Sequence, residues 1–149
     1  MKKYVKFGVM ILTSTIIMYF LMFLNVYEFD HVLFSKTRLF MSIMMGAVMA
    51  VVMLAFMLKM YTNKKANAAI FALSILLFSG SLYMVRSQST VNDADWMKAM
   101  IPHHSIALLT SERAELSDPR AKELAKEIIE AQEREIKEMK ALIEELENK

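Results

Sequence analysis

The sequence predicts an all-α membrane protein, with three spanning helices followed by a two-helix antiparallel hairpin. Three observations predict this fold. The first half contains three long stretches without a charged side chain, each long enough to cross a bilayer as a helix. The second half is rich in charge and repeats its apolar residues at helical spacing. Ser117, Asp118 and Pro119 form a turn that divides this second half into two helices.

The composition separates the two halves of the 149-residue chain. Hydrophobic residues make up 56% of it, fifteen residues are methionine, and the mean hydropathy of +0.33 is too high for an ordinary soluble domain. Residues 1–85 carry a net charge of +6, whereas residues 86–149 carry a net charge of −4. The chain has no cysteine, which excludes disulfides and thiolate metal sites. We therefore predict a membrane domain over residues 1–86 and a separate helical domain over residues 87–149.

The three predicted spans cover about residues 7–24, 39–58 and 66–85. The first span ends without the small-residue cleavage site of a signal peptide, so we expect it to be retained as a helix. Six lysines lie at the N-terminus or between the second and third spans: Lys2, Lys3, Lys6, Lys59, Lys64 and Lys65. The other side has only Lys36, Arg38 and Arg86. Because cytoplasmic segments carry the excess of basic residues, we expect a cytoplasmic N-terminus and an extracytoplasmic C-terminal domain in the cytoplasmic membrane.

Methionines are concentrated in and beside the second span. The seven are Met41, Met44, Met45, Met49, Met53, Met57 and Met60, and five of them repeat every four residues. A ladder of thioethers suits Cu(I), and the Met-x-x-x-Met pairs resemble those of the high-affinity copper transporter family, although the Gly-x-x-x-Gly of that family's third span is absent. Methionine also packs flexibly between helices and lipid. We favour packing and keep metal transport as an alternative.

The candidate site is the stretch of residues 93–111, which holds two of the three histidines and the only tryptophan. The residues that share one helical stripe here are Asp93, Met97, Met100 and His104. His103 lies about 100° around the helix from His104, and Met100 can reach either imidazole. Thioether and imidazole together favour a soft ion such as Cu(I), whereas hard cations prefer oxygen and structural zinc prefers thiolate. The stripe therefore predicts a copper site.

An ordinary helix core is the alternative interpretation of this stripe. Two adjacent imidazoles beside Pro102, which either kinks a helix or starts one, favour a site, because burying imidazoles without a use costs desolvation energy. A carboxylate-bridged di-iron centre has glutamate three residues before its histidine. Here Met100 and Ile101 occupy those positions, which argues against a di-iron centre. His31 lies in the first outer loop and is interpreted as solvated, with a site shared with His103 or His104 as the alternative.

Asn92 or Asp93 is predicted to cap the first helix of the hairpin, which ends near residue 116. Asp118 is predicted to cap the last helix, which begins at Pro119 and ends near residue 147. The apolar stripe of the last helix consists of Ala125, Ile128, Ile129, Ile136, Met139, Ile143 and Leu146. Gln132 interrupts this stripe and needs a hydrogen-bond partner. In an antiparallel hairpin the histidine region can supply that partner, and a backbone bond or a subunit contact is the alternative.

The run MIPHHSIALLTSERAE and the following DPRAKELAKEIIEAQEREIKEMKALI resemble the domain of unknown function 305 family over about residues 93–142. The hallmarks are Met-Ile-Pro-His-His and a second helix with Ile-Ile-x-x-Gln-x-x-Glu-Ile. The resemblance implies a ferritin-like helical domain exported across the inner membrane, with copper or silver binding and tolerance in some members. A methionine that many members carry after the histidine pair is missing from residues 107–111, so the metal stoichiometry does not carry over.

Spacing and resemblance together give one set of candidate residues. The candidate metal ligands are Met97, Met100, His103, His104 and Met139. The candidate supporting residues are Asp93, Gln132 and Glu135. The resemblance implies roles for Met100, His103, His104, Gln132 and Met139, and the last two of these match the second helix.

These features predict a membrane-anchored, extracytoplasmic protein that binds copper as Cu(I) in metal tolerance or handling. The sequence shows no nucleophile–base pair, phosphate-binding glycine loop or basic nucleic-acid face in its outer part, so we expect neither catalysis nor a nucleic-acid partner. The expected partners are the lipid bilayer and a second copy, because one hairpin buries little apolar area and two complete a four-helix bundle. The alternatives are a small membrane subunit that docks another envelope protein without metal, and metal transport through the second span.

Overall fold

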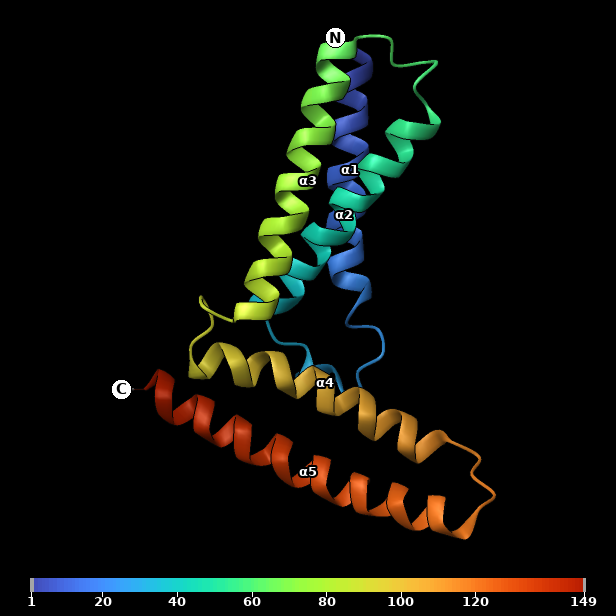
Figure 1. Cartoon of the computed structure of the whole chain (residues 1–149). Helices are drawn as coiled ribbons and strands as arrows, with labels where there is room; N and C mark the ends of the chain where they lie inside the picture. Colours follow the sequence, from blue (N-terminus) through green and yellow to red (C-terminus); the bar gives the residue numbers. More distant parts are fainter. Residues whose placement is uncertain (1, 149) are drawn as a thin grey trace. The chain divides into compact units, whose positions relative to one another are not determined.

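The computed structural model describes residues 2–148, and this range is all-α, as predicted (Figure 1). Five α-helices and one short 3₁₀ helix follow one another along the chain, and no strand occurs in the described range. The elements are α1 (Lys2–Leu21), η1 (Phe29–His31), α2 (Lys36–Phe56), α3 (Lys64–Ser87), α4 (Asp93–Arg113) and α5 (Pro119–Glu147).

The chain divides into two compact units. Met1–Met22 and Thr37–Thr90 form the first, called here the three-helix unit. Phe23–Lys36 and Val91–Lys149 form the second, called here the hairpin unit. The segment between the first two helices therefore groups with α4 and α5. The sequence predicts this segment only as a loop of the membrane part, because its attachment depends on contacts between residues far apart in the chain.

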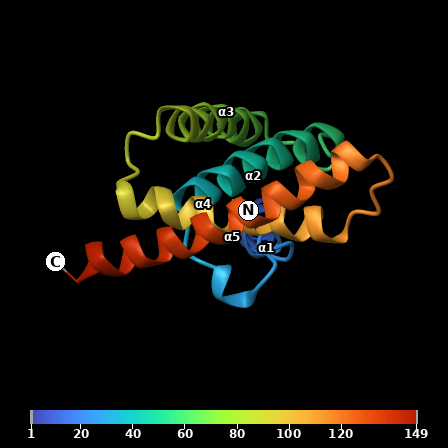
Figure 2. The same cartoon turned by 90° about the horizontal axis from the view of Figure 1, so that it is seen from below.

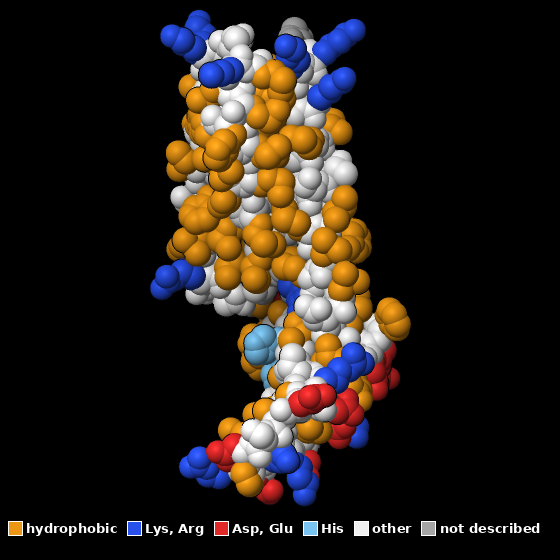
Figure 3. Space-filling model, turned by 90° about the vertical axis from the view of Figure 1, so that its right-hand side faces the viewer, with side chains coloured by type: hydrophobic (Ala, Val, Ile, Leu, Met, Phe, Trp, Pro, Cys, Tyr) orange, Lys and Arg blue, Asp and Glu red, His pale blue; other side chains and the backbone are white. Residues whose placement is uncertain are grey.

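The three helices of the three-helix unit are long and apolar enough to cross a membrane. Many large apolar side chains of this unit are exposed, and they are spread over the face seen in Figure 3; such a surface suits lipid rather than water. The helices begin and end a few residues from the predicted spans. α2 ends at Phe56, so Met57 and Met60 follow the helix instead of lying on it, and five of the seven methionines remain on α2.

Small and polar side chains allow the helices of the three-helix unit to approach one another. α3 buries Asn67, Ser74 and Ser81, which are spaced seven residues apart and so share one helix face. On α2, a Cβ atom added at Gly46 would clash with the Thr15 side chain of α1, so no larger residue fits there without a shift. Close contact through small residues is the usual packing of helices in lipid.

Capping side chains set where the last two helices begin. Asn92 Oδ1 accepts the backbone N–H of Asp95 at 2.8 Å, and the Asp95 carboxylate accepts the backbone N–H of Asn92 at 3.4 Å, which forms a capping box. Asp118 Oδ1 accepts the backbone N–H of Arg120 at 2.8 Å, and Pro119 is the first residue of α5, as predicted. α4 runs through Pro102 and ends at Arg113, a few residues before the predicted end.

α4 and α5 lie side by side and bury one core between them (Figures 1 and 2). The buried residues of this core are Met97, Ile101, Ile136, Met139 and Ile143, with Leu33 and Met100 packed against them. Part of the predicted stripe is therefore buried. Ala125, Ile128 and Ile129 are half-buried, and Leu146 is exposed. Since Leu33 comes from the segment Phe23–Lys36, this segment contributes to the core.

An ion pair joins the same segment to the start of α4. Lys36 Nζ donates to Asp95 Oδ2 at 2.6 Å, and this hydrogen bond holds the pKa of Asp95 below its ordinary value of 3.8. Because the pKa is lower in the folded protein than in the unfolded chain, the stabilising contribution is present above about pH 3.8. The contribution is lost as the pH falls through the lower folded value.

Asp95→Asn is therefore expected to destabilise the hairpin unit at pH 7, and the difference from wild type is expected to shrink below about pH 3.8. The measurement is urea unfolding of the full chain in detergent micelles at pH 7 and pH 3. Fluorescence of Trp96, the only tryptophan, reports on the hairpin unit. Asp93→Asn, at the same helix end, is the control for loss of charge near the helix terminus. If the two variants lost the same free energy of unfolding, the ion pair with Lys36 would contribute nothing to the stability of the hairpin unit.

Candidate metal site

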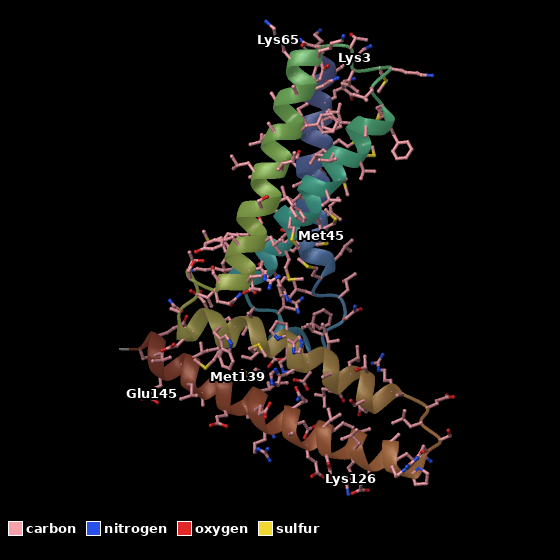
Figure 4. The ribbon with its side chains drawn as sticks, in the orientation of Figure 1. Lys3, Met45, Lys65, Lys126, Met139 and Glu145 are labelled. Atoms are coloured by element: carbon pink, nitrogen blue, oxygen red, sulfur yellow. The ribbon has the colours of Figure 1, made fainter. Side chains whose placement is uncertain are left out.

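α4 and α5 line a cavity of about 230 Å³ in the hairpin unit. Its lining residues are Trp96, Met97, His104, Glu135, Glu138, Met139 and Leu142. Three candidate ligands, Met97, His104 and Met139, therefore lie at one cavity. Met97 and His104 come from α4, while Met139, labelled in Figure 4, comes from α5. Both methionines also belong to the buried core.

Helix geometry explains which residues of the predicted stripe reach the cavity. Met97 and His104 are seven residues apart, so they point within about 20° of each other around α4. Met100 is turned about 60° away from Met97, packs against the core and does not line the cavity. On α5, Glu135 and Met139 stand four residues apart on one face. The two helices thus present two thioethers, one imidazole and one carboxylate to the same space.

The other candidate residues lie elsewhere. His103 is exposed, and its ring centroid is 6.0 Å from that of His104. Gln132 is half-buried, and within residues 2–148 it has no hydrogen bond to either histidine. Asp93 lines a neighbouring groove that it shares with Trp96 and Leu142. The structure therefore does not bring His103, Gln132 or Asp93 to the cavity. Among the predicted supporting residues, Glu135 is the one that lines the cavity and contacts the imidazole of His104.

His104 is held through both of its ring nitrogens. Nδ1 lies 2.9 Å from the carbonyl oxygen of Met100, and Nε2 lies 2.8 Å from Glu135 Oε2. A carbonyl oxygen only accepts, so Nδ1–H is the donor and its bond fixes the plane of the ring. The contact between Nε2 and the carboxylate needs one proton between them. A metal ion on Nε2 would take the place of that proton, so binding would release it.

The donor atoms around the cavity fit a soft ion better than a hard one. Two thioethers and an imidazole form the set that suits Cu(I). A hard cation would need several oxygen ligands, and only Glu135 and Glu138 supply side-chain oxygen among the lining residues. Trp96, Glu138 and Leu142 were not predicted from the sequence, although Trp96 directly precedes Met97 on α4.

The interpretation of His31 as a solvated side chain is wrong, because the residue is 4% exposed. His31 Nδ1 lies 2.9 Å from Oγ of the fully buried Ser105 on α4, and the same oxygen accepts the backbone N–H of Tyr27 at 2.6 Å. Burial, and then the nearby cation of Lys140, lower the pKa of His31 below its ordinary range. Leu33, two residues later, packs against the core between α4 and α5, but one apolar residue in a loop is too weak a signal to predict this burial.

Comparisons with known proteins match the part of the chain that lines the cavity to a sequence-family model. Residues 82–143 match the family model described as Domain of unknown function (DUF305). Over 103 residues the chain is 33% identical to "Uncharacterized protein L153" of Acanthamoeba polyphaga mimivirus, and the match covers 66% of this chain and 66% of that protein. No solved structure matches the chain. The family match contains α4 and most of α5, and it leaves out the segment Phe23–Lys36.

Proposed function

We propose that the hairpin unit, which contains most of the residues that match the DUF305 family model, binds copper as Cu(I). The observation that carries the proposal is the convergence of Met97, His104 and Met139 from two helices on one cavity. Uncharged thioethers beside an imidazole give a site that discriminates against hard cations. The proposed role is metal tolerance or handling, by binding rather than catalysis.

Each residue at the cavity has a separate part in this proposal. Met97 and Met139 would supply sulfur ligands whose availability does not depend on pH. His104 Nε2 would supply the nitrogen ligand once its proton has left, while the bond from Nδ1 to the Met100 carbonyl keeps the ring in place. The Glu135 carboxylate would then balance the single positive charge that a bound Cu(I) ion brings to the cavity.

Metal analysis of the full chain in detergent micelles tests this function. A fragment starting at residue 87 would lack Leu33 and His31, which pack against α4, so the complete chain is needed. The protein is exposed to Cu(I) under reducing conditions, desalted and analysed for bound copper. Copper should remain with the protein. A hairpin unit that stays copper-free and unchanged would instead favour the small membrane subunit that docks another envelope protein.

We also propose that the hairpin unit lies outside the cytoplasmic membrane, with the N-terminus in the cytoplasm. Support comes from the basic side chains at one end of the three-helix unit, where Lys3 and Lys65 lie together (Figures 3 and 4). Proteolysis of cells stripped of their outer layers is expected to remove the hairpin unit while the membrane is intact. Protection of this unit until the membrane is lysed would show the opposite orientation.

A further inference from the structure

We propose a second metal site in the hairpin unit, formed by Glu28, Asp30 and His31, that takes a divalent cation of borderline softness such as Zn²⁺. The ligand atoms are Glu28 Oε2, Asp30 Oδ1 and His31 Nε2, which all lie within 4.8 Å of one another. The site is separate from the cavity between α4 and α5. It also lies outside the part of the chain that matches the DUF305 family.

The distances suit ligands of one ion better than hydrogen bonds. His31 Nε2 lies 3.8 Å from Glu28 Oε2 and 3.6 Å from Asp30 Oδ1. Both separations exceed the length of an N–H···O hydrogen bond. Two ligands bound at about 2.1 Å to one tetrahedral ion stand roughly 3.4 Å apart. A cation therefore fits between the three groups after small side-chain movements.

The backbone creates this arrangement locally. Residues 29–31 form the 3₁₀ helix η1, in which the backbone N–H of His31 donates to the carbonyl oxygen of Glu28 at 3.1 Å. In a 3₁₀ helix the side chains at positions i and i+3 lie directly above one another. Glu28 and His31 stand in this relation, so the turn itself brings an imidazole and a carboxylate to the same side.

The buried imidazole is the second, independent observation that points to a ligand. His31 is 4% exposed, yet within residues 2–148 its Nε2 makes no hydrogen bond and is directed at the two carboxylates. Ser105 Oγ accepts the backbone N–H of Tyr27, and when the imidazole carries its proton on Nδ1 the second lone pair of Oγ can accept Nδ1–H of His31. This tautomer leaves the lone pair of Nε2 facing the carboxylates. A bond to the remote nitrogen is how proteins orient metal-ligating histidines.

The charges and the exposure of the cluster also suit a divalent ion. Lys140 Nζ donates to Asp30 Oδ2 at 2.5 Å, which holds this oxygen and leaves Oδ1 towards His31. Two carboxylates and one ammonium group leave a net negative charge. The side chains of Glu28 and Asp30 are 59% and 62% exposed, so water can complete the coordination. One nitrogen and two oxygen donors are ligands that Zn²⁺ accepts and Cu(I) does not favour.

The test is a Zn²⁺ titration of the full chain in detergent micelles, in competition with a chromophoric chelator. Wild type is expected to bind Zn²⁺, and His31→Gln and Glu28→Gln are each expected to weaken binding about tenfold or more, as loss of a ligand requires. Glu127→Gln, an exposed glutamate of α5, is the matched control and should bind Zn²⁺ like wild type. Circular dichroism and Trp96 fluorescence establish that each variant is folded.

Several results would overturn the proposal. Wild type that does not compete with the chelator has no such site, and wild-type affinity in Glu28→Gln excludes the exposed carboxylate as a ligand. If His31→Gln fails to fold, Glu28→Gln decides alone, because its side chain is mostly exposed. The copper proposal is tested separately: Met139→Leu should keep wild-type Zn²⁺ binding, so loss of Cu(I) binding alone would leave this second site unaffected.

Discussion

Met139→Leu is expected to lower the affinity of the full chain for Cu(I) about tenfold or more, which corresponds to about 1.4 kcal/mol or more of binding free energy. Leucine keeps the volume and apolarity of the side chain but removes the sulfur. Because volume-conserving swaps in a core usually cost less than about 1.5 kcal/mol of folding free energy, the hairpin unit should stay folded. Competition with a Cu(I) chelator measures the affinity, and Trp96 fluorescence during urea unfolding measures the stability.

Met100→Leu is the matched control for this experiment. Met100 packs against the same core as Met139 but does not line the cavity, so its replacement should leave the Cu(I) affinity close to that of wild type. His104→Gln should weaken binding as Met139→Leu does, because both residues line the cavity. If Met100→Leu lost as much affinity for Cu(I) as Met139→Leu, Met100 would also be a ligand, as the stripe in the sequence predicts. If every variant bound like wild type, the thioethers would serve packing only.

Local chemistry explains which parts of the fold could be predicted. Asp118 and Pro119 determine the start of α5 through groups adjacent in sequence, so the cap could be recognised without any tertiary information. The three helices that are long and apolar enough to cross a membrane could be predicted, because a long uncharged run is visible in the sequence alone. The ends of α1 and α2 differ from the predicted spans, since helices extend into flanking lysines or end before the apolar run does.

The site shows where sequence reasoning reaches its limit. Periodicity places Met97 and His104 on one face of α4, but it does not determine how far α5 slides along α4. That register puts Glu135, and not Gln132, 2.8 Å from His104 Nε2. Burial of His31 depends on Ser105, 74 residues away in the chain, so no local pattern predicts it. Contacts of this range come from packing, and packing is what a single sequence reveals least.

Ile101→Ala is expected to have the largest effect on stability, with a loss of about 2–5 kcal/mol from the hairpin unit. Ile101 is fully buried between α4 and α5, where it belongs to the same core as Met97 and Met139. Truncation would leave a cavity beside both methionines, so their sulfur atoms would be less well held and Cu(I) affinity should fall as well. Urea unfolding of the full chain, followed by Trp96 fluorescence, measures the loss.

Leu124→Ala provides the comparison for this variant, because Leu124 on α5 is 57% exposed and its truncation should cost within about 0.5 kcal/mol. The difference between the two variants isolates the core from the general effect of shortening an aliphatic side chain. If Ile101→Ala unfolded at the same urea concentration as Leu124→Ala, α4 and α5 would not be packed around Ile101. The convergence of thioethers and imidazole on one cavity would then lose its structural basis, since the same core holds those side chains in place.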